Sequence, residues 1–297
     1  MAAIVNHQGE RTTAMALCCV ATAAALAAAD AAVVRLLAGE VHAFVIGFFR
    51  SLFGLVTIVP LIVARPRVLK SGYRLQHATR AALKLAALVC FFMAFAAAPL
   101  ADAMAIMFTT PIFLMLGAWL WLGEKLTPGL IFALVAGFAG ALIIIDPAGH
   151  GGMEVALLLA LAGAALQALV QLMLKRMSDL DSTETLVVWN LIATVPLAAV
   201  PAAFYWTTPD LREFALLALQ GAMGAANMAL MTKAFSIADA SQIAPMDFLR
   251  LPFVAVMAWI LFGEVAGLST WLGAAIIFAA TMIVVGGGRL KRRVAED

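Results

Sequence analysis

Residues 110–124, TPIFLMLGAWLWLGE, form an apolar run whose pattern decides the fold, because residues 251–264, LPFVAVMAWILFGE, repeat it. Each run begins beside a proline, Pro111 or Pro252, and ends in Gly-Glu. The second Gly-Glu pair follows the first at a distance of nearly half the chain. A long apolar run with a later copy at this distance indicates a chain that is built from two related halves.

The composition excludes a soluble globular domain. Hydrophobic residues make up 65% of the 297 residues and charged residues only 12%, whereas about a quarter of residues are charged in soluble domains. A spanning helix needs roughly 20 apolar residues, so the chain has room for about ten. The long apolar runs also exclude an outer-membrane barrel, whose strands alternate apolar and polar residues. We therefore expect an all-α integral membrane protein.

Ten apolar segments can be read as membrane-spanning helices. They cover residues 14–34, 42–64, 81–98, 101–122, 128–146, 153–173, 184–205, 212–233, 240–262 and 269–287. The first segment could instead be a cleavable signal peptide, because Arg11 precedes an alanine-rich run. Its removal would leave the sixth segment without a counterpart, which favours retention.

When the two Gly-Glu pairs are aligned, each of the first five segments falls on one of the last five, and Trp119 falls on Trp259. Five is an odd number, so the two halves must enter the membrane in opposite orientations. Such inverted repeats are the usual construction of secondary transporters. We expect residues 1–147 to form the first five-helix repeat and residues 148–297 the second.

The basic residues predict the orientation, because lysine and arginine gather in cytoplasmic loops. If both termini are cytoplasmic, fifteen basic residues lie inside: Arg11, Arg65, Arg67, Lys70, Arg74, Arg80, Lys84, Lys125, Lys175, Arg176, Lys233, Arg289, Lys291, Arg292 and Arg293. Only Arg35 and Arg212 then lie outside. The basic residues within 289–293 are explained by membrane orientation, so no nucleic-acid partner is expected. We expect a multi-pass protein of a bacterial-type inner membrane with both termini in the cytoplasm.

The sequence carries no recognisable catalytic machinery. The four histidines, His7, His42, His77 and His150, are all assigned to a terminus or a loop. There is no HExxH motif, nucleophile elbow, P-loop or metal-ligand cluster. Asp30, Asp102 and Asp247 are the only acids loosely suited to membrane-depth chemistry, and Cys18, Cys19 and Cys90 are expected to be packing residues. We expect neither an enzyme nor a cofactor.

Charged residues within the spans point to a site, because their exposure to lipid is costly. At 1.5 Å per residue, Arg50 lies about 12 Å and Arg250 about 16 Å from the ends of their segments. Asp247 shares a helix face with Arg250. These residues could form structural ion pairs, Asp247 neutralising Arg250 or serving Arg50. Alternatively, an arginine binds a substrate carboxylate while Asp247 faces an amine or carries a proton.

Neutral polar residues and prolines extend this candidate site. Gln167, Gln171, Asn190 and Asn227 could bind substrate or pair across helices, and Trp119 could line an apolar cavity. Interrupted segments at matching positions point to the binding site of a transporter. Three prolines, Pro111, Pro245 and Pro252, interrupt the fourth and ninth segments and are expected to bend them. The Gly-Glu pairs are expected to be structural corners.

Proline-containing fourth and ninth segments that end in Trp-x4-Glu resemble the drug/metabolite transporter superfamily, specifically its EamA-type members. The resemblance covers the whole chain and is clearest in residues 98–147 and 238–287 and in the Phe49-Arg50 pair. It implies ten helices, a central cavity formed chiefly by the first, third, fourth, sixth, eighth and ninth of them, and alternating access.

The resemblance also implies transport of small organic solutes. Bacterial members of the family include exporters of aromatic and other amino acids, so we expect amino-acid export by a monomer in the lipid bilayer. The alternatives within the family are an importer or exchanger of nucleotide-related metabolites and a drug efflux protein. A channel or a membrane sensor is the alternative outside transport.

Overall fold

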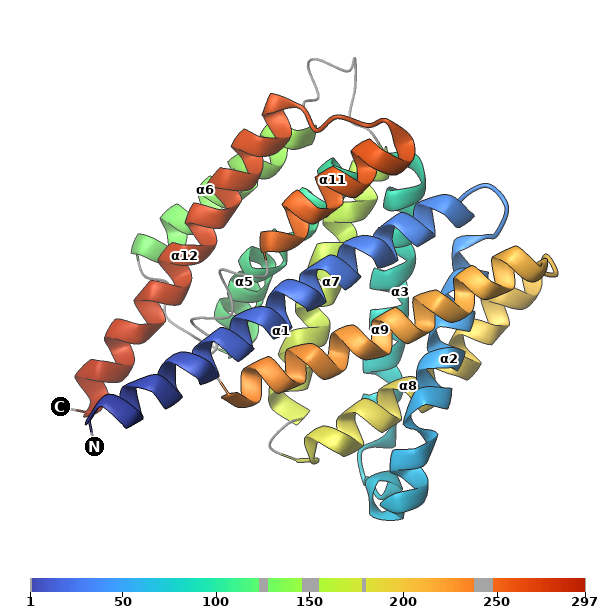
Figure 1. Ribbon diagram of the computed structural model, residues 1–297, viewed down its shortest axis with the longest axis horizontal. Helices are drawn as coiled ribbons and strands as arrows, with labels where there is room; N and C mark the ends of the chain where they lie inside the picture. Colours follow the sequence, from blue (N-terminus) through green and yellow to red (C-terminus); the bar gives the residue numbers. More distant parts are fainter. Residues whose placement is uncertain (1, 123–127, 146–154, 178–179, 238–247, 297) are drawn as a thin grey trace.

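A computed structural model describes residues 2–122, 128–145, 155–177, 180–237 and 248–296, and every regular element in these ranges is a helix (Figure 1). The elements in chain order are α1 (Ala2–Leu37), α2 (Ala43–Ala64), the short 3-10 helix η1 (Pro66–Leu69), α3 (Arg74–Ala97), α4 (Leu100–Met107), α5 (Thr110–Leu122), α6 (Pro128–Ile145), α7 (Val155–Met177), α8 (Thr183–Phe204), α9 (Leu211–Ile237), α11 (Arg250–Phe262) and α12 (Leu268–Glu296).

The described helices suit a bilayer. Seven segments are long and apolar enough to cross it, and one of them, Leu100–Gly117, runs through α4 into α5. Three further apolar helices are shorter, at Ile131–Ile145, Arg250–Phe262 and Leu268–Ile283. Large apolar side chains are exposed, such as Leu75 at 81% and Val200 at 63%, as expected where the solvent is lipid. The structure thus supports a multi-pass membrane protein, while the number ten remains a prediction.

The fourth expected segment is two helices rather than one. α4 ends at Met107 and α5 begins at Thr110, which places Pro111 in the first turn of α5. A first-turn proline removes no helical hydrogen bond. The Thr109 and Thr110 hydroxyls donate to the carbonyls of Ile106 (2.8 Å) and Met107 (2.7 Å) at the break. The chain therefore bends before this proline with its freed carbonyls satisfied.

Pro252 has a similar place in the second half of the chain. It is the third residue of α11, again in the first turn, and residues 248–249 form a 3-10 turn before that helix. Pro245 lies outside the described residues. Prolines therefore mark the starts of α5 and α11 rather than kinks within longer helices.

Helix boundaries recur at the offset that separates the two Gly-Glu pairs. α2 and α8 begin at residues 43 and 183 and end at residues 64 and 204; α5 and α11 begin at residues 110 and 250 and end at residues 122 and 262. α1 and α7 end at residues 37 and 177, and α3 and α9 end at residues 97 and 237. One offset therefore relates both the sequence pattern and the helices of the two halves.

The helices pack in pairs, with α1 beside α9 and α6 beside α12 (Figure 1). α3 packs against α7, and α2 against α8. The α6–α12 contact is close enough for backbones to touch, since a Cβ atom on Gly273 would lie 2.5 Å from the Gly140 carbonyl oxygen. Beyond these pairs, α1 also contacts α3, α4 and α11, and α4 contacts α11.

The structure corrects the expectation that the third spanning segment begins only at residue 81. α3 begins at Arg74, so His77, Arg80 and Lys84 are helical. His77 is 0% and Arg80 4% exposed, and Arg80 donates to the Leu186 carbonyl of α8. The helix extends beyond its apolar part because these polar side chains pack against the neighbouring helix.

One histidine, His77, differs from its expected position in a loop. His77 lies within α3 and His7 within α1. His42 caps α2, its ring nitrogen accepting from the Phe44 N–H. His150 lies outside the described residues.

Candidate functional site

An ion pair between neighbouring helices forms the polar centre of the molecule. The Arg50 guanidinium of α2 donates to the Asp30 carboxylate of α1, and the side chains are 25% and 17% exposed. Each residue lies seven positions from the α1–α2 connection, about 10 Å along its helix axis. Arg250 of α11 and Gln220 of α9 also lie close to Asp30. One carboxylate therefore lies near two guanidinium groups from distant parts of the chain.

A central cavity of about 170 Å³ surrounds this ion pair. Its polar lining comes from Asp30, Arg50, Asn227 and Arg250. Its apolar lining comes from aromatic and methionine side chains of α3, α4 and α9: Phe91, Phe92, Phe95, Met104, Met107 and Met223. Five of the six helices that the resemblance implied contribute to this lining; α7 does not, and Arg50 of α2 does.

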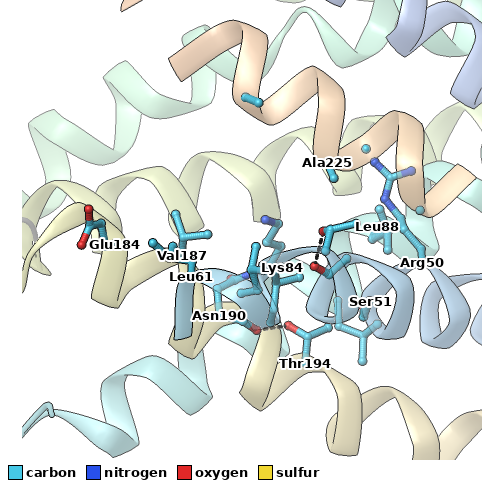
Figure 2. Close-up of a pocket in the computed structure, with 18 of the residues that line it drawn as sticks. Arg50, Ser51, Leu61, Lys84, Leu88, Glu184, Val187, Asn190, Thr194 and Ala225 are labelled. Atoms are coloured by element: carbon cyan, nitrogen blue, oxygen red, sulfur yellow. Dashed lines mark hydrogen bonds between the residues drawn. The ribbon is translucent and has the colours of Figure 1, made fainter. Parts of the chain in front are cut away.

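A larger cavity of about 650 Å³ lies between α2, α3, α8 and α9 (Figure 2). It runs along α2 from Arg50 to Leu61 and reaches Glu184 at the start of α8 and Lys233 near the end of α9. We call it the large cavity. We call the end of the molecule that carries η1 the η1 end. The large cavity thus connects the polar centre with the η1 end.

The wall between the large and central cavities is thin. Arg50, Leu88 and Gly224 line both cavities. A Cβ atom at Gly224 would lie 3.2 Å from Arg50 Nη2, so the absence of a side chain there makes room for the guanidinium. Arg50 therefore stands at the junction of the two cavities, held by Asp30 on one side and α9 on the other.

A third cavity of about 670 Å³, which we call the vestibule, lies at the opposite end, between the ends of α1, α3 and α8 and the start of α2. Its aromatic lining includes His42 and Tyr205, whose rings stack at 4.1 Å. Phe92 lines both the vestibule and the central cavity. The large cavity, the central cavity and the vestibule thus follow one another along α3, separated by Arg50 and Phe92.

A group of hydrogen bonds closes the molecule at the end that carries Glu264. The Arg35 guanidinium, at the end of α1, bonds to Glu264 Oε1 (2.6 Å) and donates to the carbonyls of Phe95 (2.9 Å) and Ala98 at the end of α3. Glu264 Oε2 accepts from the Leu100 N–H at the start of α4 (3.0 Å). We call this the Glu264 network, and it ties α1, α3, α4 and the turn after α11 together.

The turn that positions Glu264 depends on the preceding glycine. Gly263 has φ +68°, in the left-handed region that favours glycine, and its N–H bonds back to the last turn of α11. Glu264 therefore forms a corner, as expected, but its contacts reach α1 and α4. The matching Gly123 and Glu124 lie outside the described residues.

The structure brings some of the predicted site residues together and separates others. Arg50, Arg250 and Asn227 share the central cavity, and Asn190 lines the large cavity. Asn227 also pairs across helices, donating to the Ala23 carbonyl of α1 (2.7 Å).

The remaining predicted residues lie elsewhere. Gln167 and Gln171 are half-buried on α7 and line none of the three cavities. Trp119 is 38% exposed on α5 and likewise lines none of them. Asp247 lies outside the described residues, and the partner that the structure provides for Arg50 is Asp30.

Lys84 is a cavity residue that sequence reasoning did not select. It lies ten residues into α3 and lines the large cavity (Figure 2), although it was counted among the basic residues expected on the cytoplasmic side. A usable signal was the four-residue spacing of Arg80, Lys84, Leu88 and Phe92, which places them on one helix face. Asp30 was noticed only as an isolated acid, because its pairing with Arg50 depends on how two helices pack.

A Ser-His-Asp cluster occurs at the η1 end without the geometry of a catalytic triad. Ser71 Oγ donates to Asp181 Oδ2 (2.7 Å), and His77 Nε2 lies 2.9 Å from the same oxygen and 3.2 Å from Ser71 Oγ. A triad places the serine and the acid on different ring nitrogens. His77 Nδ1 is buried and has no partner among the described residues, so this cluster fastens α3 to the α7–α8 connection.

Metal chemistry has no obvious location in the described chain. No group of three histidine, cysteine, aspartate or glutamate side chains there could hold an ion. The three cysteines, Cys18, Cys19 and Cys90, are free thiols. The chemistry that the site can offer is recognition by charge and by hydrogen bonds inside an apolar enclosure.

Comparison with known proteins identifies the family. The model of the EamA-like transporter family matches residues 14–146 and, a second time, residues 154–286. The chain belongs to the EamA-like transporter family. This confirms the resemblance to the drug/metabolite transporter superfamily that the proline and Gly-Glu pattern indicated. The protein is accordingly a transporter in a membrane.

Several curated relatives are transporters. A riboflavin transporter of Rhizobium johnstonii is 33% identical over 218 residues, which cover 73% of this chain and 72% of the relative. An S-adenosylmethionine uptake transporter of Rickettsia bellii is 29% identical over 252 residues, 84% of this chain and 86% of the relative. A pseudopaline exporter of Pseudomonas aeruginosa is 28% identical over 235 residues, 78% and 82% of the two chains.

The fold is also found among solved structures. One crystal structure superposes with a TM-score of 0.61 and covers 96% of this chain and 99% of its own, at 18% sequence identity. At this identity the likeness concerns the fold alone.

Proposed function

We propose that this protein is a secondary transporter that moves a small organic metabolite by alternating access through the three cavities along α3. The observation that carries the proposal is the position of the Asp30–Arg50 ion pair. It lies where the large and central cavities meet, so a solute that moves between them must pass Arg50. Intramembrane charges beside a cavity are typical of transport pathways.

We further propose that the transporter consists of two inverted five-helix halves, residues 1–147 and 148–297. The constant offset between matching helix boundaries supports this division, as does the double match of the family model. Helix packing supports it too: exchanging the halves turns the α1–α9 contact into the α7–α3 contact, and leaves α2–α8 and α6–α12 unchanged.

The orientation follows from the positive-inside rule. The loop around η1 contains Arg65, Arg67 and Lys70, all exposed, so the η1 end is cytoplasmic in this proposal and both termini are as well. The large cavity then opens toward the cytoplasm, and the Glu264 network seals the outer side. In this proposal the inward-facing state of the cycle is the one described, because the large cavity opens toward the cytoplasmic side.

In the outward-facing state the Glu264 network would have to separate, since it joins the helices that surround the central cavity. Arg35 and Glu264 are 21% and 24% exposed, so water can reach and solvate them when they part. A substrate that bound Arg50 would compete with Asp30 for the guanidinium. Such competition couples occupancy of the site to helix movement.

The relatives guide the choice of substrate. Their names concern riboflavin, S-adenosylmethionine and pseudopaline, and include both uptake and export. They do not favour the expected amino-acid export in particular, and they partly fit the alternative of a nucleotide-related metabolite. We propose a metabolite similar in size to these compounds that has a ring or another apolar body. The direction of net transport would follow the gradient across the membrane.

Flux into proteoliposomes tests the proposal. Labelled riboflavin, S-adenosylmethionine and aromatic amino acids are offered to liposomes with purified protein, and to liposomes with the Arg50→Gln variant as a matched control. Saturable flux of at least one compound, lost in the variant, is expected. Folded wild-type protein that moves none of these classes, or that conducts ions instead, would contradict the proposal.

Cysteine labelling in cells tests the proposed orientation. Single cysteines replace Lys70 at the η1 end or Glu40 at the opposite end in a background without native cysteines. A membrane-impermeant maleimide is expected to label the cysteine at position 40 from outside and the one at position 70 only after lysis. The reverse pattern would overturn the proposed orientation.

A further inference from the structure

We infer that Lys84 and Arg50 form an anion-binding site in the large cavity, and that the transported metabolite carries a carboxylate or phosphate group. This inference rests on the proposed function, because it names the substrate class of the same pathway. It concerns a residue, Lys84, that lies apart from the Asp30–Arg50 pair and has no role in closing either end.

The first support is the charge balance of the cavity. Lys84 is half-buried, and no described residue forms an ion pair or a hydrogen bond with its ammonium group. The charged groups that act on it electrostatically are both positive, Arg80 and Arg50. The nearby carboxylates are engaged elsewhere, Asp30 by Arg50 and Glu184 by Arg65 at the cavity mouth. Among the described residues that line the cavity, basic side chains therefore outnumber acidic ones, with Arg50, Lys84 and Lys233 against Glu184.

The second support is the cost of this arrangement. Lys84 lies about 15 Å from the start of α3 at 1.5 Å per residue, well inside the spanning segment Arg74–Ala97. A cation that is partly withdrawn from water without a counter-charge is costly. A ligand that brings a negative charge offsets that cost, whereas a neutral ligand does not and a cation increases it.

The third support is a set of neutral polar groups beside Lys84. Asn190 is 5% exposed, and its side-chain oxygen is buried with no partner among the described residues. The Thr194 hydroxyl donates to the main-chain carbonyl of Asn190 and keeps its own lone pairs available. In Figure 2, Lys84 extends into the cavity between Asn190 and Arg50. A ligand could thus place its anionic group on Lys84 and donate a hydrogen bond to Asn190.

The rest of the cavity sets the shape of the ligand. Apolar side chains from all four helices line it, among them Ile58, Leu85, Leu88, Val187, Leu191 and Ala225. Its volume of about 650 Å³ lies in the range that suits a small organic molecule. The site therefore fits a metabolite with an apolar body and one anionic end, and disfavours an inorganic ion that would leave the apolar wall uncovered.

Matched ligand pairs test the inference. Indole-3-acetate and indole-3-acetamide share one ring system and differ mainly in charge, while phenol keeps the ring of phenyl phosphate and lacks its phosphate group. Calorimetric titration of the purified full-length protein is expected to give an acid affinity roughly ten times that of its neutral partner, the scale of one charge-assisted hydrogen bond. Lys84→Gln removes this preference, Lys84→Arg retains it, and Lys70→Gln, an exposed lysine of the η1 loop, leaves it unchanged.

The outcomes separate the inference from the proposed function. Equal affinity for acid and neutral partner, no acid binding at millimolar concentration, or a preference that survives Lys84→Gln would overturn the anion site. Saturable flux in liposomes, without a preference for the acid over its neutral partner, would contradict the anion site but not the proposed transport function. An acid preference that depends on Lys84, without flux of any acid, would establish the site and overturn transport.

Discussion

The two ends of the molecule use basic side chains in opposite ways. At the Glu264 end, Arg35 bonds to a carboxylate and two backbone carbonyls, and four segments of the chain are held together. Toward the η1 end, Lys84 lines an open cavity and has no such partner among the described residues. A cation that reaches acceptors on several helices closes a pathway, whereas a cation that faces a cavity is available for a ligand.

The difference has a physical basis in the two side chains. A guanidinium carries five N–H donors in a rigid fork and can bridge several acceptors at once. An ammonium group is a compact charge on a flexible stem that can follow a ligand. The positions agree with these properties, because Arg35 joins α1, α3 and the turn after α11, while Lys84 extends from α3 alone.

The largest effect is expected at the ion pair between the two ends. Asp30→Asn removes the carboxylate that holds Arg50, and breaking a buried pair costs about 3–5 kcal/mol, reduced here because both side chains are partly exposed. Flux should be lost, and the thermal midpoint of the detergent-solubilised protein should fall by several degrees. Asp30→Asn combined with Arg50→Gln should regain stability but not flux. Wild-type flux in Asp30→Asn would show that the pair is not part of the pathway.

Glu264→Gln should convert the closed end into an open one. The change removes a charge from a pair at 2.6 Å and weakens the capping of α4. A cysteine in place of Met104, a 2%-exposed residue of the central cavity, should react about ten times faster with an external impermeant maleimide, the effect of about 1.4 kcal/mol. Native cysteines are replaced beforehand.

The matched control for Glu264→Gln is Glu40→Gln at the same end. Glu40 pairs with Arg212 at 3.6 Å, and the side chains are 50% and 63% exposed, so its loss should leave labelling unchanged. Equal acceleration by both variants would mean that general loosening, and not the Glu264 network, governs access.

A smaller effect is expected from Gly224→Ala at the wall between the cavities. The new methyl group would lie 3.2 Å from Arg50 Nη2, so the guanidinium must shift by a few tenths of an ångström, and flux should fall several-fold with little change in stability. Gly72→Ala is the control, because nothing lies within 4 Å of its added Cβ. Unchanged flux in Gly224→Ala would indicate that the Arg50 position is not critical.

The smallest effect should come from the ion pair at the mouth of the large cavity. Arg65 and Glu184 are 64% and 42% exposed, and exposed pairs contribute about 0–1 kcal/mol. Glu184→Gln is expected to change flux less than about twofold, in contrast to Glu264→Gln. A large effect would mean that the η1 end also has a closing contact in the structure described.

Sequence reasoning located the helices better than it located the site. Every described α-helix overlaps one of the predicted apolar segments, because a bilayer imposes both length and composition on a span. Most boundaries agree to within a few residues, although α1 begins 12 residues before its segment and α12 ends 9 residues after its segment. The extent of α3 was missed because polar side chains such as Arg80 are stabilised by a neighbouring helix. The division between α4 and α5 was expected only as a bend.

The candidate site could be predicted from the sequence less completely than the helices. Arg50 and Arg250 could be selected from sequence because a charge within an apolar segment is conspicuous. The Asp30 carboxylate, which pairs with Arg50 and lies close to Arg250, and the junction at Gly224 could not be selected, since each depends on which helix faces which. Lys84 could be found from helical spacing but was counted with the cytoplasmic basic residues, because basic residues precede it along the chain.

The sequence by itself determined that this chain is a membrane protein of the EamA-like transporter family. It also determined that the second half of the chain repeats the pattern of the first. These properties depend on composition and local spacing, which a bilayer constrains directly. Only the tertiary structure decided that Glu264 bonds to Arg35 and that Arg50 separates two cavities. Such contacts join residues as many as 229 positions apart, and their geometry arises from the packing of side chains between helices.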